Sequence, residues 1–375
     1  MRILKYKLGD QRGVVFILVA IALLVLLAFA ALALDVGNVL VVRNELQDIA
    51  DGAALAGART LGRLYECDGD IVACPRKMPY PAQLTYVADV GTIVNSIQGV
   101  ASVNIAGGMT GITINAGDIV IGNWDTTTKT VDPITVTSPD AVRVTTRRDA
   151  SANGPISTFF ARILGINTVN VSATATAALT GESTAGPGGL PLPVAINKSW
   201  VADPTHCNNN LTFHPSSAGT CSAWHAYTDT DPYSPNASDM RSMIDAIAAL
   251  TFSSPKTIAG QTQYDFTNGT LASLFTHDNI QNLFNVMRVK NDGILDMDTS
   301  DATWTTSVPV FDDTLAGCHP NGPLTIAGFA TIKITGVDPP PATTIYAEFE
   351  CDNVVEGRGS GSNYGTKGSI PGLVQ

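Results

Sequence analysis

The strongest hydrophobic pattern in the chain is an uncharged run at residues 14–34, VVFILVAIALLVLLAFAALAL. At the rise of an α-helix, a run of this length extends roughly 30 Å, which is the thickness of a hydrocarbon core. No second run of this kind follows in the sequence. The pattern therefore predicts one transmembrane helix, whose lipid-facing residues include Val14, Leu18, Leu24, Phe29 and Leu34.

After Asp35 the apolar residues become periodic, and neither a proline nor a turn cluster interrupts them. One face carries apolar or small residues at helical spacing from Val39 to Gly57, which predicts that the helix continues to about Leu61. We assign residues 35–64 to this membrane-proximal helix. Because alanine and glycine allow a second backbone to approach closely, the face suits helix contact. It would serve a partner protein, a second copy of the chain, or the chain's own exported domain.

The remaining pattern mixes helical stripes with short β-branched segments, which predicts an α+β fold. A first unit at 65–180 carries a helix at 81–98, a strand meander and a short helix at 155–165. A second unit at 192–356 carries helical stripes at 240–250 and 278–289 and strands at 306–311, 323–336 and 342–351. Residues 181–191 (GESTAGPGGLP) are rich in glycine and proline, so we expect a linker there. We expect residues 357–375, which begin with a glycine-rich stretch, to form a flexible tail.

The distribution of basic residues predicts on which side of the membrane each part of the chain lies. Four basic residues precede the apolar run, whereas Arg43 is the only one soon after it, so we expect residues 1–13 to be cytoplasmic and the body extracytoplasmic. The alternative is a cleaved signal peptide, since the run contains small-x-small patterns, but its length favours a retained anchor. The formal net charge of −11 argues against nucleic-acid binding, because phosphate backbones repel an acidic body.

A motif follows the apolar run: Gly13 precedes it, and behind it come Asp35-x-Gly37 and a pattern of Arg43, Leu46, Gln47, Ala50, Asp51, Ala53, Ala54 and Gly57. This segment resembles the N-terminal segment of the TadG-like proteins of the Tad (tight adherence, Flp pilus assembly) system. The resemblance implies a single-pass protein of the bacterial inner membrane with its bulk in the periplasm. It also implies other Tad/Flp pilus assembly membrane proteins as partners, and the motif as the helix-docking site.

Six cysteines in an exported chain predict three disulfides, because the periplasm is oxidising, and fifteen pairings are open. Sequence neighbourhood favours Cys67 with Cys74, Cys207 with Cys221, and Cys318 with Cys351. The weaker alternative is a zinc site, since His206, His214 and His225 flank Cys207 and Cys221. A cluster of aspartates at 292–301 offers a calcium site, although a solvated acidic loop is the simpler interpretation.

The sequence offers no catalytic motif: it lacks a nucleophile elbow, a phosphate loop and a metalloprotease helix. We therefore expect no enzyme activity, cofactor or metal. The leading hypothesis is a non-enzymatic, membrane-anchored envelope component of a Tad/Flp-type pilus assembly or secretion system. The main alternative is an anchored or shed surface adhesin or binding protein, and an anchored hydrolase ranks third.

Overall fold

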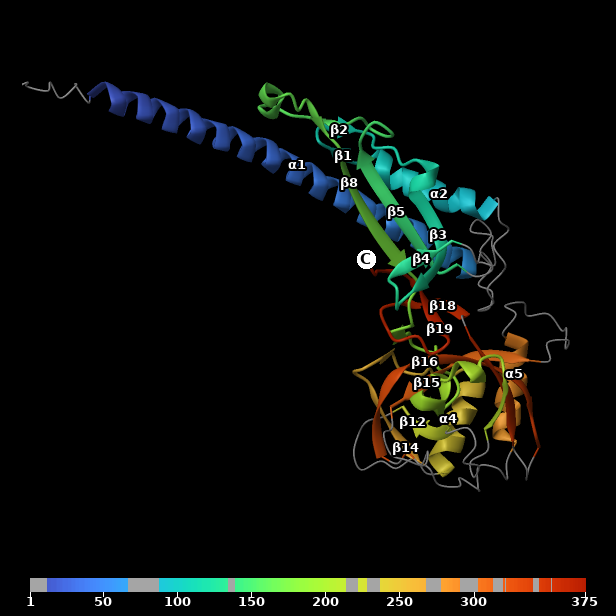
Figure 1. The fold of residues 1–375 in the computed structure, drawn as a ribbon. Helices are drawn as coiled ribbons and strands as arrows, with labels where there is room; N and C mark the ends of the chain where they lie inside the picture. Colours follow the sequence, from blue (N-terminus) through green and yellow to red (C-terminus); the bar gives the residue numbers. More distant parts are fainter. Residues whose placement is uncertain are drawn as a thin grey trace, which may run out of the picture. The chain divides into compact units, whose positions relative to one another are not determined.

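The computed structural model in Figure 1 describes a long N-terminal helix and a β-rich remainder, so the fold class is α+β as expected. The residues that the structure describes are 12–66, 88–133, 139–213, 222–227, 237–267, 278–290, 303–312, 320, 322–339, 344–351 and 353–375. They form two compact units. Unit 1 contains Met1–Ala53, Gln98–Ile119 and Val144–Ala175, and unit 2 contains Ala54–Ile97, Val120–Arg143 and Thr176–Gln375.

The apolar run and the periodic segment after it form one uninterrupted helix, α1 (Arg12–Glu66). The large side chains of its first half are exposed, whereas residues from Val42 onward bury one face. Among the described residues, α1 is the one helix long and apolar enough to cross a membrane. A single helix is thus apolar on all sides in its first half and buries only one face in its second half.

The segment that follows α1 contains a second helix and four strands of a five-stranded sheet with the order β20-β8-β5-β3-β4, whose strand β20 comes from near the C-terminus. Two short antiparallel pairs, β1 with β2 and β6 with β7, complete it. The elements are α2 (Ala88–Ser102), β1 (Ile105–Ala106), β2 (Met109–Thr110), η1 (Ala116–Asp118), β3 (Ile119–Asp125), β4 (Thr130–Asp132), β5 (Ala141–Arg148), β6 (Ile156–Ser157), η2 (Ala161–Leu164), β7 (Thr168–Val169) and β8 (Val171–Ala178).

The C-terminal region of unit 2 is built on a seven-stranded sheet with the order β11-β17-β16-β14-β12-β10-β15. An additional pairing of β15 with β16 closes five of these strands into a ring. The elements are β9 (Thr184–Ala185), β10 (Val194–Asn197), α3 (Lys198–Val201), η3 (Pro204–His206), β11 (Asn210–Phe213), β12 (Ser222–Ala226), α4 (Ala237–Ala248), β13 (Thr257–Ile258), β14 (Gln263–Thr267), α5 (Asn279–Lys290), β15 (Trp304–Phe311), β16 (Gly322–Val337), β17 (Ile345–Glu350), β18 (Asn353–Arg358), β19 (Thr366–Ile370) and β20 (Gly372–Leu373).

The linker expected at 181–191 is instead packed inside unit 2. It contributes β9 to a sheet with the order β13-β9-β18-β19, and Glu182, Ala185 and Leu190 are buried. Gly181 lies so close to Ser362 that a Cβ atom would overlap the backbone there. Its glycines therefore serve close backbone packing and do not form a spacer.

The tail expected at 357–375 is also structured. It contains the end of β18 and all of β19 and β20, and Thr366, Lys367 and Ser369 are buried. A Cβ atom on Gly368 would collide with the backbone of Arg358 and Gly359, because β18 and β19 pair there. Glycine composition in this region reflects strands that need small residues.

Candidate functional site

The first feature of the site is Asp35, the residue directly after the apolar run of α1, whose side chain is buried. Its carboxylate accepts hydrogen bonds from the backbone N–H groups of Phe159 (2.7 Å), Phe160 (3.0 Å) and Ala161 (2.6 Å). Phe159 and Phe160 precede the short helix η2 and Ala161 begins it, and the first N–H groups of a helix have no partner within it. Asp35 thus caps a segment that is more than 120 residues away in sequence.

Polar groups further along α1 repeat this arrangement within unit 1. The Glu45 carboxylate accepts from the backbone N–H of Gly107 at 2.7 Å. The carbonyl of Leu46 accepts from the Thr146 hydroxyl of β5 at 2.8 Å, and Gln47 Nε2 donates to Asp51 at 2.7 Å and to the Thr174 carbonyl of β8 at 3.3 Å. These contacts fix the rotation of α1 against the strands.

Small side chains line the buried face of α1. Within unit 1, Ala50 and Ala53 are fully buried, and a Cβ atom on Gly52 would lie 3.3 Å from Val100 Cγ1 of α2. Within unit 2, a Cβ atom on Gly57 would lie 2.9 Å from Ile97 of α2. There is therefore no room for larger residues on this face.

Two protein-family models match segments of the chain that contain these contacts. A family model described as putative Flp pilus-assembly TadE/G-like matches residues 13–60, and a second, described as putative Tad-like Flp pilus-assembly, matches residues 89–177. We call these matched stretches the first and the second Tad segment. The resemblance read from the sequence is confirmed, and the first segment coincides with most of α1. Neither the curated proteins nor the solved structures contain a match to the chain.

The first Tad segment, residues 13–60, divides the predicted docking motif into two groups. Most of its members face the chain itself: Asp35, Leu46, Ala50, Ala53, Ala54 and Gly57 are buried, and Gln47 and Asp51 are half-buried. Gly37 and Arg43 are exposed. The small-residue face therefore packs on the body of the same chain, and the exposed members of the motif are the ones that remain accessible to a partner.

The residues predicted to anchor the protein are exposed wherever the structure describes their side chains. Leu18, Leu24, Phe29 and Leu34 are all exposed on α1, and the side chain of Val14 lies outside the described residues. An exposed surface of this extent is unfavourable in water and favourable in a hydrocarbon core.

Within unit 2, one hydrogen bond from α1 and one ion pair from the residue before β5 reach β19 near the end of the chain. Arg59 donates to Glu66 at 3.0 Å and to the carbonyl of Ser369 at 3.1 Å. Lys367 and the carboxylate just before β5, Asp140, form a buried pair at 2.9 Å. The sequence separation of these partners, 310 and 227 residues, hides both contacts from sequence reasoning.

Glu182 differs from these carboxylates because its Oε2 has no hydrogen-bond partner among the described residues. Burial raises the pKa of Glu182 to about 8, so the side chain is largely protonated at neutral pH. His225 is also enclosed, between the rings of Tyr227 and Tyr264, and burial lowers the pKa of His225 to about 3. Both groups belong to the core of unit 2.

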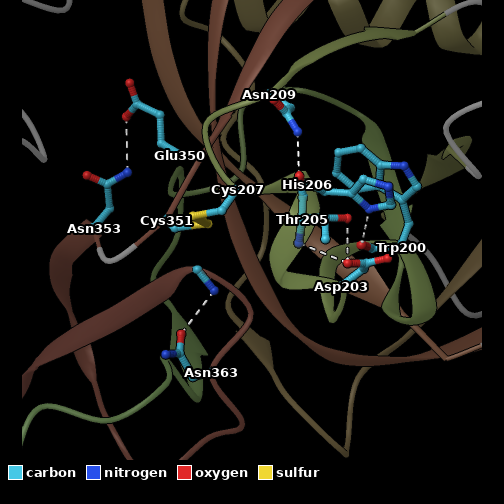
Figure 2. The surroundings of a disulfide bond; sticks show 11 residues. Trp200, Asp203, Thr205, His206, Cys207, Asn209, Glu350, Cys351, Asn353 and Asn363 are labelled. Atoms are coloured by element: carbon cyan, nitrogen blue, oxygen red, sulfur yellow. Dashed lines mark hydrogen bonds between the residues drawn. A yellow bond between two sulfur atoms is a disulfide. The ribbon is translucent and has the colours of Figure 1, made fainter.

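The disulfide in the described residues joins Cys207 to Cys351, with their Cα atoms 5.6 Å apart (Figure 2). The expected pairs Cys207–Cys221 and Cys318–Cys351 are therefore wrong. Strand register gives the reason: Asn210 of β11 pairs with Glu348 of β17, so the residues beyond these strand ends meet. Neighbours in sequence are not neighbours across the sheet.

The zinc alternative loses Cys207 as a candidate ligand. Cys207 is bonded to sulfur and is not available as a thiolate, and the ring of His206 stacks on Trp200 with centroids 4.3 Å apart. Figure 2 shows His206 beside Trp200. Several other predictions lie outside the described residues, namely those for Cys67, Cys74, His214, Cys221, the aspartates at 292–301 and Cys318.

Proposed function

We propose that the protein is a non-enzymatic component of a Tad/Flp-type pilus assembly or secretion system, held in the bacterial inner membrane by α1 with its body in the periplasm. The observation that carries this proposal is the coincidence of the first Tad segment with a single helix that has two different halves. One half exposes apolar residues on all sides, and the other is built into the body.

The continuity of α1 supports a mechanical role. Because no break separates the exposed half from the buried half, a displacement or rotation of the anchor is transmitted to the loop between β6 and β7 through Asp35, and to β5 and β8 through Leu46 and Gln47. A rigid connection of this kind suits a part of an assembly machine whose position in the membrane must fix the position of its periplasmic body. A flexible tether would suit a freely ranging binding domain.

The residues left for partners are those of the Tad segment that face away from the chain. Arg43 is exposed, as are Leu40 and Val36, which precede it at helical spacing. We propose that other Tad membrane proteins contact this side of α1. The buried alanine face holds the chain's own fold.

Co-purification tests the proposal. Full-length tagged protein from its native membranes is solubilised in mild detergent, and the proteins retained with it are identified. We expect other Tad proteins among them, and we expect Arg43→Glu to reduce their yield because it reverses an exposed charge on the proposed side. The matched control is Lys129→Glu, a charge reversal at an exposed turn of unit 2, which should leave the yield unchanged.

The adhesin alternative gives a different result. If no Tad protein is retained with the wild type, and protease removes the body from intact cells, the protein acts at the cell surface. If Arg43→Glu and Lys129→Glu retain the same partners in the same amounts, the assembly role stands and the proposed contact side is wrong.

A further inference from the structure

A cluster of exposed apolar side chains lies in unit 1, on the loop that connects β6 to β7. Phe159 and Phe160 are followed by Ile163, Leu164 and Ile166, and Ile163 and Leu164 are 82% and 78% exposed. The backbone of this loop is well ordered by contacts, since Asp35 holds its amides and Thr158 pairs with Asn167 and Ile166. An ordered loop with its largest apolar groups outward is unusual for a surface in water.

The position of the loop indicates what its exposed apolar side chains contact. Asp35 follows the last residue of the apolar run, so the three hydrogen bonds from Phe159, Phe160 and Ala161 fasten the loop to α1 at the end of its apolar half. Ile163 and Leu164 are only two and three residues beyond Ala161, which keeps them within roughly 10 Å of that point. Figure 1 shows this loop, in green, beside the middle of α1.

We propose that the loop at 159–166 is a second membrane contact, whose apolar side chains enter the lipid interface beside α1. The inference rests on the proposed membrane anchoring of α1. Apolar side chains of interfacial segments enter roughly 5–10 Å into the boundary between headgroups and acyl chains. Arg162 lies among them, is exposed, and suits the phosphate level of the bilayer.

Two membrane contacts restrict the orientation of the protein more than a single contact does. A single helix is free to rotate about its axis and to change its tilt, whereas a helix with a loop fixed beside it has a set depth and a set rotation. Asp35 is the positioning residue, because it ties the loop to the helix. The body is then held in one orientation above the membrane, as the proposed assembly role requires.

The test places a tryptophan at selected positions in the full chain, reconstituted in vesicles of phosphatidylcholine and phosphatidylglycerol, with or without bromine on the acyl chains. Bromine quenches nearby tryptophan, and the emission is compared with that of the parent protein. Phe29→Trp reports on the anchor and Ile163→Trp on the loop. Val103→Trp is the matched control, since Val103 is 80% exposed in the same unit. Val103 is close in sequence to Gly107, whose backbone N–H donates to the Glu45 carboxylate. Glu45 lies roughly 15 Å further along α1 than Asp35.

We expect bromination to reduce the added emission of Phe29→Trp and Ile163→Trp roughly twofold or more, because both rings would lie among acyl chains, and to leave Val103→Trp unchanged. Leu164→Trp is a second reporter with the same expected loss. Both loop positions are exposed, so the variants should unfold at the same denaturant concentration as the parent.

Each other outcome overturns the inference. If Phe29→Trp is quenched while both loop reporters behave like Val103→Trp, the anchor stands and the loop contact is wrong. If Phe29→Trp is not quenched, the membrane anchoring fails and the loop inference fails with it. If the emission of the loop reporters follows the protein-to-lipid ratio and ignores bromine, the loop binds a second copy of the chain.

Discussion

Residues 50–58 of the long helix and the core of the C-terminal sheet are packed with side chains of very different size. Between residues 50 and 58 the buried face of α1 is made of small residues, with Ala50, Ala53, Ala54 and Ala58 fully buried. The largest fully buried side chains of the C-terminal region are aromatic: Tyr264, Phe266, Phe311, Phe329 and Phe349. In the first region backbones approach each other closely, and in the second side-chain volume fills the space.

This difference determines which substitutions each region tolerates. A face of alanine and glycine has no free volume, so enlargement is costly, and there is little side chain to remove. An aromatic core loses many contacts on truncation. Enlarging a buried side chain should therefore destabilise the α1 contact more, whereas truncating one should destabilise the C-terminal core more.

The largest effect is expected from Phe329→Ala in β16, which should lower the free energy of unfolding by about 3–5 kcal/mol because it leaves a large cavity. The matched control is Phe29→Ala, an aromatic truncation at an exposed position of α1, which should leave denaturant unfolding in detergent nearly unchanged. Equal losses at the two positions would contradict the assignment of Phe29 to a lipid-facing surface.

The disulfide should rank next. Replacing Cys207 and Cys351 together with serine should lower the free energy of unfolding by about 2–5 kcal/mol, since the bond joins residues 144 positions apart. Denaturant unfolding measures the loss, and mass spectrometry of peptides from the unreduced parent locates the bond. A peptide linking Cys207 to Cys221 would contradict the observed pairing.

In the small-residue face, Ala53→Leu should lower the free energy of unfolding by about 1–3 kcal/mol, because the added atoms cannot be accommodated. Leu40→Ala, at an exposed position of the same helix, is the control and should have little effect. If Ala53→Leu were neutral for stability but abolished co-purification of Tad proteins, the face would serve partners instead of the fold.

Two carboxylates extend the comparison, since Asp35 has three amide partners whereas Glu182 Oε2 has none among the described residues. The raised pKa of Glu182, about 8, means that the folded protein holds a proton that the unfolded chain releases near its usual pKa of 4.5. The free energy of unfolding should therefore fall as pH rises between these values, by up to about 1.4 kcal/mol per pH unit.

Glu182→Gln should remove that part of the pH dependence while keeping the shape of the side chain. The measurement is the free energy of unfolding at several pH values between 5 and roughly 8 for both proteins. Parallel curves for the parent and the variant would show that Glu182 is ionised in the fold.

Asp35→Ala should have the smallest effect, about 0.5–2 kcal/mol, as expected for loss of a helix cap whose amides gain water in its place. Asp35→Asn keeps one carbonyl acceptor and should lose less. Hydrogen exchange at Phe159, Phe160 and Ala161 reports the effect locally, and unchanged exchange in Asp35→Ala would contradict the cap.

Sequence periodicity predicted the regular elements closely. Stripes at 240–250 and 278–289 became α4 and α5, and apolar β-branched segments at 306–311 and 323–336 became β15 and β16. The expected helix at 155–165 is instead β6 followed by the short η2, although Gly165 ends η2 in the left-handed conformation. Its exposed Phe159 and Ile163 supply no buried stripe, so Asp35 and not packing orders it.

The contacts that define the site were beyond sequence reasoning for one physical reason. The cap at Asp35, the pair of Asp140 with Lys367, and the bond of Cys207 to Cys351 all join distant segments that only the tertiary fold brings together. Periodicity shows which face of an element is buried and not what covers it. The alanine face of α1 was therefore predicted as a contact surface, while its partner could have been either another protein or the chain itself.

The central claim is that one unbroken helix both anchors the protein and forms part of the core of its body. Hydrogen–deuterium exchange of the full-length protein in lipid nanodiscs tests it directly. The account predicts slow exchange across residues 15–65 without a gap at Asp35 or Gly37. Fast exchange at residues 35–41, or the absence of residues 15–34 from the mature protein, would contradict it.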